Sequence, residues 1–139
     1  MIRAATPLDQ DWLIETAHSV YHDDFRALLP EVDWAVFDLD FFSARFARDL
    51  ARVRIACRDG QRSGFSLMTG THLDMLFVTP AARNAGIGTA LLEHATTLEC
   101  FAVNAAARRF YEREGWRAEC FSHRLFGGVD CAFVDYVRR

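Results

Sequence analysis

Apolar residues recur at two different spacings along the chain, and each spacing predicts a different kind of element. Ile2 to Ala5 has the composition of a short strand. A helix start is predicted directly after it, from Thr6 followed by Pro7, with the acidic Asp9 three positions after the threonine. Beyond them the apolar positions lie three or four residues apart, at Leu13, Ile14, Ala17 and Val20. A first amphipathic helix is therefore predicted on this segment.

A second helix is predicted to begin near Asp38 or Asp40. Its apolar positions again follow a helical spacing and predict a buried stripe at Leu39, Phe42, Phe46 and Leu50. The charged positions between them are expected to face water, at Arg45, Arg48 and Asp49.

The middle of the chain changes to strand-forming sequence interrupted by tight turns. Val53 to Cys57 and Gly64 to Met68 are predicted to form a hairpin around Asp59-Gly60, which is a strong turn signal. After a further turn at Thr69-Gly70, residues 72–78 form the next predicted strand. Pro80 ends that strand, because proline has no N–H group to donate to a sheet.

The second half alternates strands with two further helices. A short helix follows the turn at 83–89 and ends near Ala95 or Thr96, and another begins at Asn104 and stops at Gly115. The last two strands, Arg117 to Phe126 and Val129 to Val137, form a hairpin about Gly127-Gly128. These patterns predict one mixed α/β (α+β) domain over residues 1–139, with a mostly antiparallel sheet of about six to seven strands and about four helices.

Composition narrows the possible functions. The chain has 139 residues, of which 51% are apolar, enough for one core, and twelve Phe residues predict an aromatic interior. The net charge of −3 gives no electrostatic footprint for nucleic acid. No apolar run approaches a membrane span, and the four cysteines, Cys57, Cys100, Cys120 and Cys131, lack C-x-x-C spacing. We therefore expect buried free thiols, a cytoplasmic location, and neither nucleic-acid nor membrane partners.

The turn between residues 83 and 89, Arg-Asn-Ala-Gly-Ile-Gly-Thr, carries the clearest chemical signal. A helix that opens directly after glycines has free backbone N–H groups at the positive end of its dipole, which favours a phosphate group. Gly86 and Gly88 lack a Cβ, so an anion can approach the backbone closely, and Arg83 can add a charged contact. The sequence is neither a P-loop nor a three-glycine dinucleotide fingerprint.

A second block follows the glycine turn, and in it Asn104 precedes Phe110-Tyr111-Glu112-Arg113 and Gly115-Trp116. The two blocks have the same order along the chain as two motifs of a known family. Together the two blocks resemble the GCN5-related N-acetyltransferase (GNAT) superfamily. The resemblance implies acetyl-coenzyme A as co-substrate and no metal. It also implies a gap between the strand before the turn and the strand before Asn104, where the pantetheine arm pairs with backbone. The cofactor-binding residues that it implies are Leu76, Phe77, Val78, Arg83, Asn84, Ala85, Gly86, Ile87, Gly88, Thr89, Asn104, Phe110 and Tyr111.

The same resemblance suggests the groups that move protons. Tyr111 lies where family members commonly carry the tyrosine that protonates the leaving thiolate, although a tyrosine packed on the helix face is the structural alternative. Asp74, and after it Glu99, lie on strands where some members carry an activating carboxylate, but both could be ordinary surface charges. His72 and His123 are further candidates, and many members use no fixed base.

The acceptor is expected to be a primary amine. The resemblance places residues 21–26 over the acceptor site, so Tyr21, Asp23 and Asp24 are candidate substrate-binding residues, although a solvated helix end explains the two acids equally well. A small amine or amino-acid derivative is slightly favoured over a protein N-terminus or lysine. The C-terminal hairpin also allows a homodimer through an edge strand.

Two features depart from the family pattern. Gly88 and Asn104 are sixteen positions apart, fewer than in most relatives, and position 85 is Ala where relatives often have a basic residue. The short segment is expected to reshape the adenosine side of the cofactor cleft, and Ala85 to remove one phosphate contact, while neither change affects the fold. The alternative functions are a coenzyme A-binding module without catalysis and a transferase with a longer acyl donor.

Overall fold

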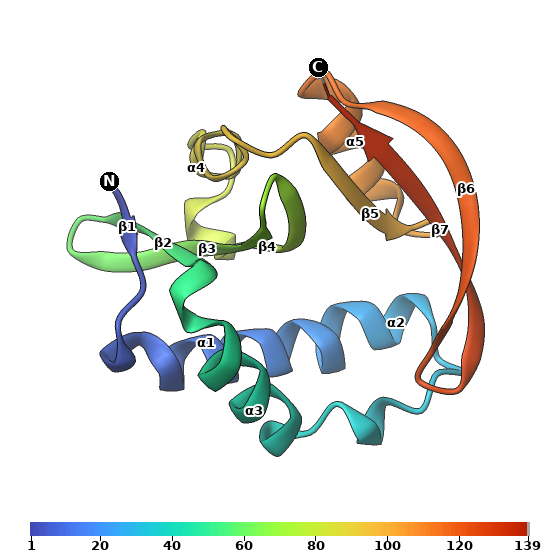
Figure 1. Cartoon of the computed structure of the whole chain (residues 1–139), viewed down its shortest axis with the longest axis horizontal. Coiled ribbons are helices and arrows are strands. Elements are labelled where there is room, and N and C mark those ends of the chain that lie inside the picture. Colours follow the sequence, from blue (N-terminus) through green and yellow to red (C-terminus); the bar gives the residue numbers. More distant parts are fainter. Residues whose placement is uncertain (139) are drawn as a thin grey trace.

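A seven-stranded sheet runs through the chain, in the order β1-β2-β3-β4-β5-β7-β6. The computed structural model describes residues 1–138 (Figure 1). β4 and β5 are parallel, and the other neighbouring strands are antiparallel, as the sequence predicts. The strands are β1 (Ile2–Ala4), β2 (Val53–Arg58), β3 (Gln61–Thr69), β4 (His72–Val78), β5 (Thr97–Phe101), β6 (Arg117–Phe126) and β7 (Val129–Val137).

The α-helices lie on both faces of this sheet. They are α1 (Gln10–Ser19), α2 (Arg26–Leu28), α3 (Leu39–Asp49), α4 (Ile87–Leu91) and α5 (Ala105–Arg113), and a π-helical segment, Val20–Phe25, joins α1 to α2. Leu13 of α1 and Phe42 of α3 belong to one core cluster with Phe65 of β3. Leu92, just after α4, and Tyr111 of α5 belong to a second cluster with Val134 of β7. The two clusters therefore occupy opposite faces of the sheet. Within residues 1–138 no helix is both long enough and apolar enough to cross a membrane.

Two predictions about α3 are wrong. Leu39 is 52% exposed, because it is the first helical residue and lies beyond the edge of the core. Asp49 is buried, although we expected it to face water. Its carboxylate accepts hydrogen bonds from Arg45 Nε at 2.7 Å and Arg48 Nη2 at 3.0 Å, which compensate for the loss of water. The predicted start of the helix is confirmed, and the Asp38 side chain caps it by accepting a hydrogen bond of 2.8 Å from Phe41 N.

A second buried carboxylate fastens the first strand to the sheet. Asp9 accepts two hydrogen bonds from Arg3, at 2.7 and 2.8 Å, and one from Arg62 Nε at 2.8 Å. The backbone N–H of Thr6 also donates to it at 2.8 Å, which completes the predicted capping arrangement. These hydrogen bonds, led by those from Arg3, hold the pKa of Asp9 well below its usual range.

The predicted turns around glycine are confirmed, and one of them joins distant parts of the chain. Gly127 has φ +53°, and a Cβ at this position would lie 2.4 Å from the Val32 side chain. Its carbonyl accepts a hydrogen bond of 2.9 Å from Asp33 N. The tip of the β6–β7 hairpin is thereby held against the loop between α2 and α3.

The helix α4 is even shorter than predicted, because it ends at Leu91 instead of near Ala95, and residues 92–96 connect it to β5. Arg138, just after β7, donates to the carbonyl groups of Leu92 and Ala95, the latter at 3.0 Å. Its guanidinium also lies 4.7 Å from the centre of the Trp116 ring. These contacts satisfy carbonyl groups that a longer helix would have used internally.

The four cysteines are free, as predicted, but they are not all buried. Cys131 is buried, Cys57 and Cys100 are half-buried, and Cys120 is exposed on β6. β6 lies at the edge of the sheet and most of its residues are exposed, so its burial does not alternate from one residue to the next.

Candidate active site

The sheet opens between its two parallel strands. β4 pairs with β5 only at His72–Thr97 and Leu73–Leu98, whereas β4 continues to Val78 and β5 to Phe101. Figure 1 shows the two strands running apart beyond that point. On its other side β4 remains paired with β3 as far as Val78. The half-buried residues Leu76, Phe77 and Val78 therefore have one backbone edge without a strand partner, as the family resemblance implies.

The turn at the end of β4 presents free backbone donors. Asn84 and Gly86 have left-handed backbone conformations, with φ +65° and +78°. Among the described residues, no backbone carbonyl accepts a hydrogen bond from the N–H groups of residues 84–89, which include Ala85, Ile87 and Thr89. Arg83 is exposed, and its Nε lies 3.4 Å from the Val78 carbonyl. The turn thus has the open N–H groups and the nearby guanidinium that a diphosphate requires.

α5 packs directly against this turn. A Cβ at the buried Gly88 would lie 3.0 Å from the Phe110 ring, so only a glycine lets the two helices approach this closely. The Thr89 hydroxyl donates to Glu114 at 2.5 Å and ties the start of α4 to the end of α5. Asn104 accepts a hydrogen bond from Ala107 N at 3.2 Å, so this side chain caps α5. Its predicted contact with the cofactor stays a prediction.

Tyr111 lies on the inner side of α5, and its side chain is mostly buried, with 8% exposure. Its ring packs on Trp116 and Tyr136. Burial, and then the nearby Cys100 thiol, raises the pKa of Tyr111 above its ordinary value. Within residues 1–138 the hydroxyl has no hydrogen-bond partner, yet it is not among the fully sealed polar atoms, which are those of Ser66 and Trp116. The phenol therefore stays protonated and keeps a small opening to solvent.

The two candidate bases have different surroundings. Asp74 is exposed at a bulge in β4 and accepts a hydrogen bond from Thr69. Glu99 is half-buried on β5, where Arg124 donates to both carboxylate oxygens, at 2.7 and 3.1 Å. His72 lies 3.5 Å from the same carboxylate. Both acids flank the place where β4 and β5 separate, but only Asp74 is free of an arginine in the described part of the chain.

The three candidate substrate-binding residues are not alike. Tyr21 packs into an aromatic group with Phe42 and Phe126, with ring centres 4.9 and 6.2 Å away, and burial raises its pKa. Asp23 accepts a hydrogen bond of 2.8 Å from Ser19, and Asp24 is exposed. All three lie on the π-helical segment, a conformation that is frequent at functional sites. Tyr21 is half-buried and packs against the core, the two acids are exposed, and the role of all three in substrate binding stays a prediction.

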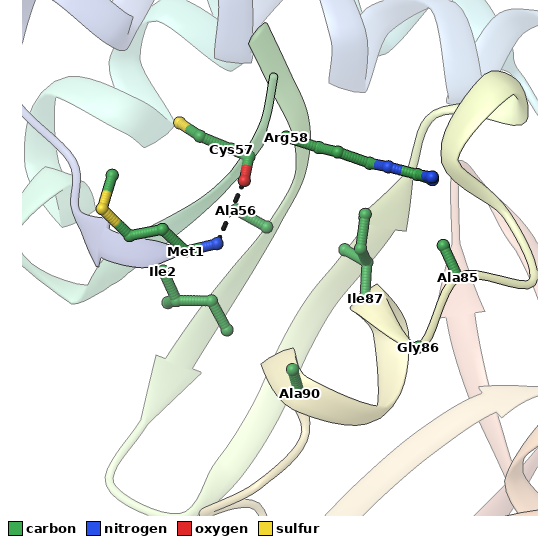
Figure 2. Close-up of a pocket in the computed structure, with 9 residues that line it drawn as sticks. All are labelled: Met1, Ile2, Ala56, Cys57, Arg58, Ala85, Gly86, Ile87 and Ala90. Atoms are coloured by element: carbon green, nitrogen blue, oxygen red, sulfur yellow. Dashed lines mark hydrogen bonds between the residues drawn. The ribbon is translucent and has the colours of Figure 1, made fainter. Parts of the chain in front are cut away.

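Some features of the site could not be seen in the sequence. A pocket of about 290 Å³ adjoins the glycine turn, and Arg58 at the end of β2 lines it together with Ala85 and Gly86 (Figure 2). Nothing in the linear sequence connects Arg58 with the turn, because the connection arises from the order of the strands. His123 lies 3.5 Å from Asp130 on the exposed hairpin, away from the β4–β5 opening. No group of three or more potential metal ligands occurs among the residues described.

A sheet that opens between two parallel strands, followed by a glycine turn with free N–H groups, is the framework of a coenzyme A-dependent acetyltransferase. The domain model described as acetyltransferase (GNAT) domain matches residues 43–118, which is more than half of the chain. The chain therefore belongs to the GNAT family.

Three curated relatives carry related sequences. The chain is 42% identical over 60 residues to the peptidyl-lysine N-acetyltransferase YjaB of Salmonella typhimurium, covering 39% of this chain and 41% of that protein. It is 34% identical over 96 residues to YjaB of Escherichia coli, covering 56% and 65%. A match to the peptidyl-lysine N-acetyltransferase YiaC of Escherichia coli covers 51% of that protein. The chain thus spans less than two thirds of each of these relatives.

Solved structures share the fold over nearly the whole chain. The solution structure of apo-form YjaB from Escherichia coli has a TM-score of 0.77 at 23% identity and covers 99% of this chain and 95% of its own. The structure of yncA from Salmonella typhimurium with its cofactor acetyl-CoA has a TM-score of 0.69 at 15% identity and covers 98% and 91%. These likenesses establish the fold.

Proposed function

We propose that this protein is an N-acetyltransferase that moves an acetyl group from acetyl-coenzyme A to a primary amine. The observation that carries the proposal is the separation of β4 from β5 directly before the glycine turn. Together these features offer an unpaired strand edge and a set of free N–H groups, one after the other along the chain. A ligand with an amide arm and a diphosphate matches that order of binding groups.

The residues present suit that ligand. The free edge of Leu76 to Val78 pairs with the amide groups of the pantetheine arm, and the N–H groups of residues 84–89 bind the diphosphate. When bound, acetyl-coenzyme A supplies an activated thioester. The amine nitrogen forms a bond to the thioester carbon, the bond from carbon to sulfur breaks, and the amine proton is lost. Tyr111, which burial keeps protonated, donates a proton to the departing thiolate.

The proton of the amine needs an acceptor. Asp74 is the better candidate, because its carboxylate is exposed and faces a hydroxyl rather than an arginine. Glu99 accepts two hydrogen bonds from Arg124, so both of its carboxylate oxygens are already engaged with β6. We therefore assign Asp74 as the base, acting directly or through water, and Glu99 as a residue that orders β5 and β6.

The acceptor in our proposal is the lysine side chain of a peptide, ahead of a small amine. The names of the curated relatives support this order, which reverses the preference drawn from the sequence. Asp23 and Asp24 are exposed at one end of the helical layer, where they attract a cationic amine. A coenzyme A-binding module without catalysis is the second candidate, and the burial of Tyr111 is the observation that favours it.

The test is an acetyl-transfer assay with thiol release as the readout. The acceptors are a blocked peptide with one lysine, the same peptide with arginine in its place, and a panel of small amines. The chain contains no lysine, so acetylation of its own lysines contributes no background in mass spectrometry. We expect one acetyl group on the lysine peptide and none on the arginine peptide. Binding of acetyl-coenzyme A without transfer to any acceptor would favour the non-catalytic module.

A further inference from the structure

The pocket beside the glycine turn has mostly apolar walls and one charged side chain. It lies between the β1–β2 edge of the sheet and the start of α4, and its volume is about 290 Å³. Ala56 of β2, with Ile87 and Ala90 of α4, gives it apolar walls. Among the described residues that line it, Arg58 carries the only charged side chain.

Arg58 differs from the arginines that hold the fold together. Arg3 and Arg62 bind Asp9, and Arg124 binds Glu99. Within residues 1–138 the exposed Arg58 side chain has no ion pair and no hydrogen bond. Figure 2 shows that this side chain extends from β2 across the pocket toward Ala85 and Ile87. The guanidinium is therefore held near the glycine turn by its place on the strand and not by a partner.

An unpaired guanidinium beside free backbone N–H groups is a binding arrangement for phosphate. Arginine presents its donors in a planar fork that matches two phosphate oxygens, and it is always charged. Apolar walls weaken the competition from water, so a charged contact is stronger there than on an open surface. The side chain at position 85 is only a methyl group, and Ala85 lines the same pocket as Arg58.

We propose that Arg58 binds a phosphate group of coenzyme A from the β2 side of the glycine turn. This inference rests on the proposed function, because it takes coenzyme A as the ligand of the turn. It adds a contact from the β2–β3 hairpin to a site that otherwise consists of the β4–α4 turn. The hairpin thereby becomes part of the cofactor site, although it is remote from the turn in sequence.

The test is calorimetric titration of acetyl-coenzyme A into the full chain and three variants. Arg58→Gln removes the charge, and Arg58→Lys keeps the charge without the planar fork. Arg117→Gln removes an exposed arginine from β6, the strand at the opposite edge of the sheet. We expect Arg58→Gln to raise the dissociation constant about five- to tenfold, the loss of one charge-assisted hydrogen bond at a partly exposed site. The dissociation constant of Arg58→Lys should lie between those of the parent and Arg58→Gln, and that of Arg117→Gln should match the parent.

A second ligand, 3′-dephospho-acetyl-coenzyme A, identifies the phosphate. If Arg58→Gln weakens the binding of this ligand as much as that of acetyl-coenzyme A, Arg58 contacts the diphosphate. If the parent and Arg58→Gln bind this ligand equally, Arg58 contacts the 3′-phosphate. Equal dissociation constants for the parent and Arg58→Gln, in a parent that binds, would overturn the role of Arg58 and leave the proposed function standing. A parent that does not bind acetyl-coenzyme A would overturn both. Thermal melting of each variant checks that the fold is retained.

Discussion

Tyr111 and Tyr136 form a natural pair for separating catalysis from stability. Their rings pack together in the second core cluster, with centres 5.9 Å apart, but their hydroxyl groups differ. The Tyr136 hydroxyl donates to Glu112 at 2.6 Å and accepts from Arg108 Nε at 3.1 Å. The Tyr111 hydroxyl has no hydrogen bond within residues 1–138. Removing each oxygen therefore tests a different role.

The expected magnitudes follow from these contacts. Tyr136→Phe loses hydrogen bonds to two charged groups, and since Glu112 is 51% exposed and can regain water, the cost is about 1–2 kcal/mol. For a chain of this size that lowers the melting temperature by about 3–8 °C. Tyr111→Phe has no hydrogen bond to lose, so its stability changes by less than about 0.5 kcal/mol. If Tyr111 protonates the thiolate, its removal lowers kcat about a hundredfold or more.

The assays are thermal melting and steady-state transfer with a lysine peptide, on both variants and the parent. We expect Tyr111→Phe to lose turnover and keep its melting temperature and its affinity for acetyl-coenzyme A. Tyr136→Phe should have a lower melting temperature than the parent, and its kcat should stay within a few-fold of the parent's. The reasoning is refuted if Tyr111→Phe turns over like the parent, or if it is destabilised as much as Tyr136→Phe.

Two other substitutions address the cofactor turn and the acid stability of the fold. Gly86→Ala should weaken acetyl-coenzyme A binding at least about tenfold, because its Cβ occupies the space that the phosphate needs. Alanine is preferred to valine, since φ is +78° and a β-branched residue would strain the turn further. Gly70→Ala is the matched control, with φ +61° and open space around it in another turn, so equal binding losses in the two variants would count against the site. Asp9→Asn should cost about 2–3 kcal/mol at neutral pH, less than for a fully buried pair because Arg3 and Arg62 are 35% and 34% exposed. The pKa of Asp9 is lowered in the fold, so ionised Asp9 stabilises above pH ~4 and this contribution is lost as the pH falls toward the folded-state pKa. Urea unfolding at several pH values should show the parent and Asp9→Asn converging in acid, and a constant difference would contradict the linkage.

Local sequence signals were sufficient for most of the fold. The helix α5 begins after Asn104 and ends before Gly115, as these residue types predict, and the two hairpins have their turns at the predicted Asp59-Gly60 and Gly127-Gly128. Such signals work because capping and left-handed turns depend on one or two neighbouring residues. The opening between β4 and β5 also agrees with the family resemblance.

The errors arise where residue type alone does not tell how a side chain or a helix end is surrounded in the fold. Asp49 has the residue type of a surface position, but Arg45, Arg48 and Arg52 neutralise it in the fold and allow its burial. Cys120 lies on a strand, yet that strand is at the edge of the sheet, so the thiol is exposed. The early end of α4 depends on Arg138, at the other end of the chain.

The candidate site divides in the same way. The turn at 83–89 is a backbone feature that its own short motif predicts, and the free strand edge at 76–78 is what the family resemblance implies. The side chains around them depend on packing between elements. The pairing of Glu99 with Arg124 and the place of Arg58 beside Ala85 follow from the strand order and could not be predicted from spacing.

Binding of acetyl-coenzyme A tests the central claim most directly. The measurement is calorimetric titration of the full chain with acetyl-coenzyme A, beside free adenosine, which lacks both the diphosphate and the pantetheine arm. The free strand edge and the glycine turn predict binding in the micromolar range for acetyl-coenzyme A and none for adenosine. Absence of binding, or equal binding of adenosine, would contradict the assignment of the β4–β5 opening and the turn as a coenzyme A site.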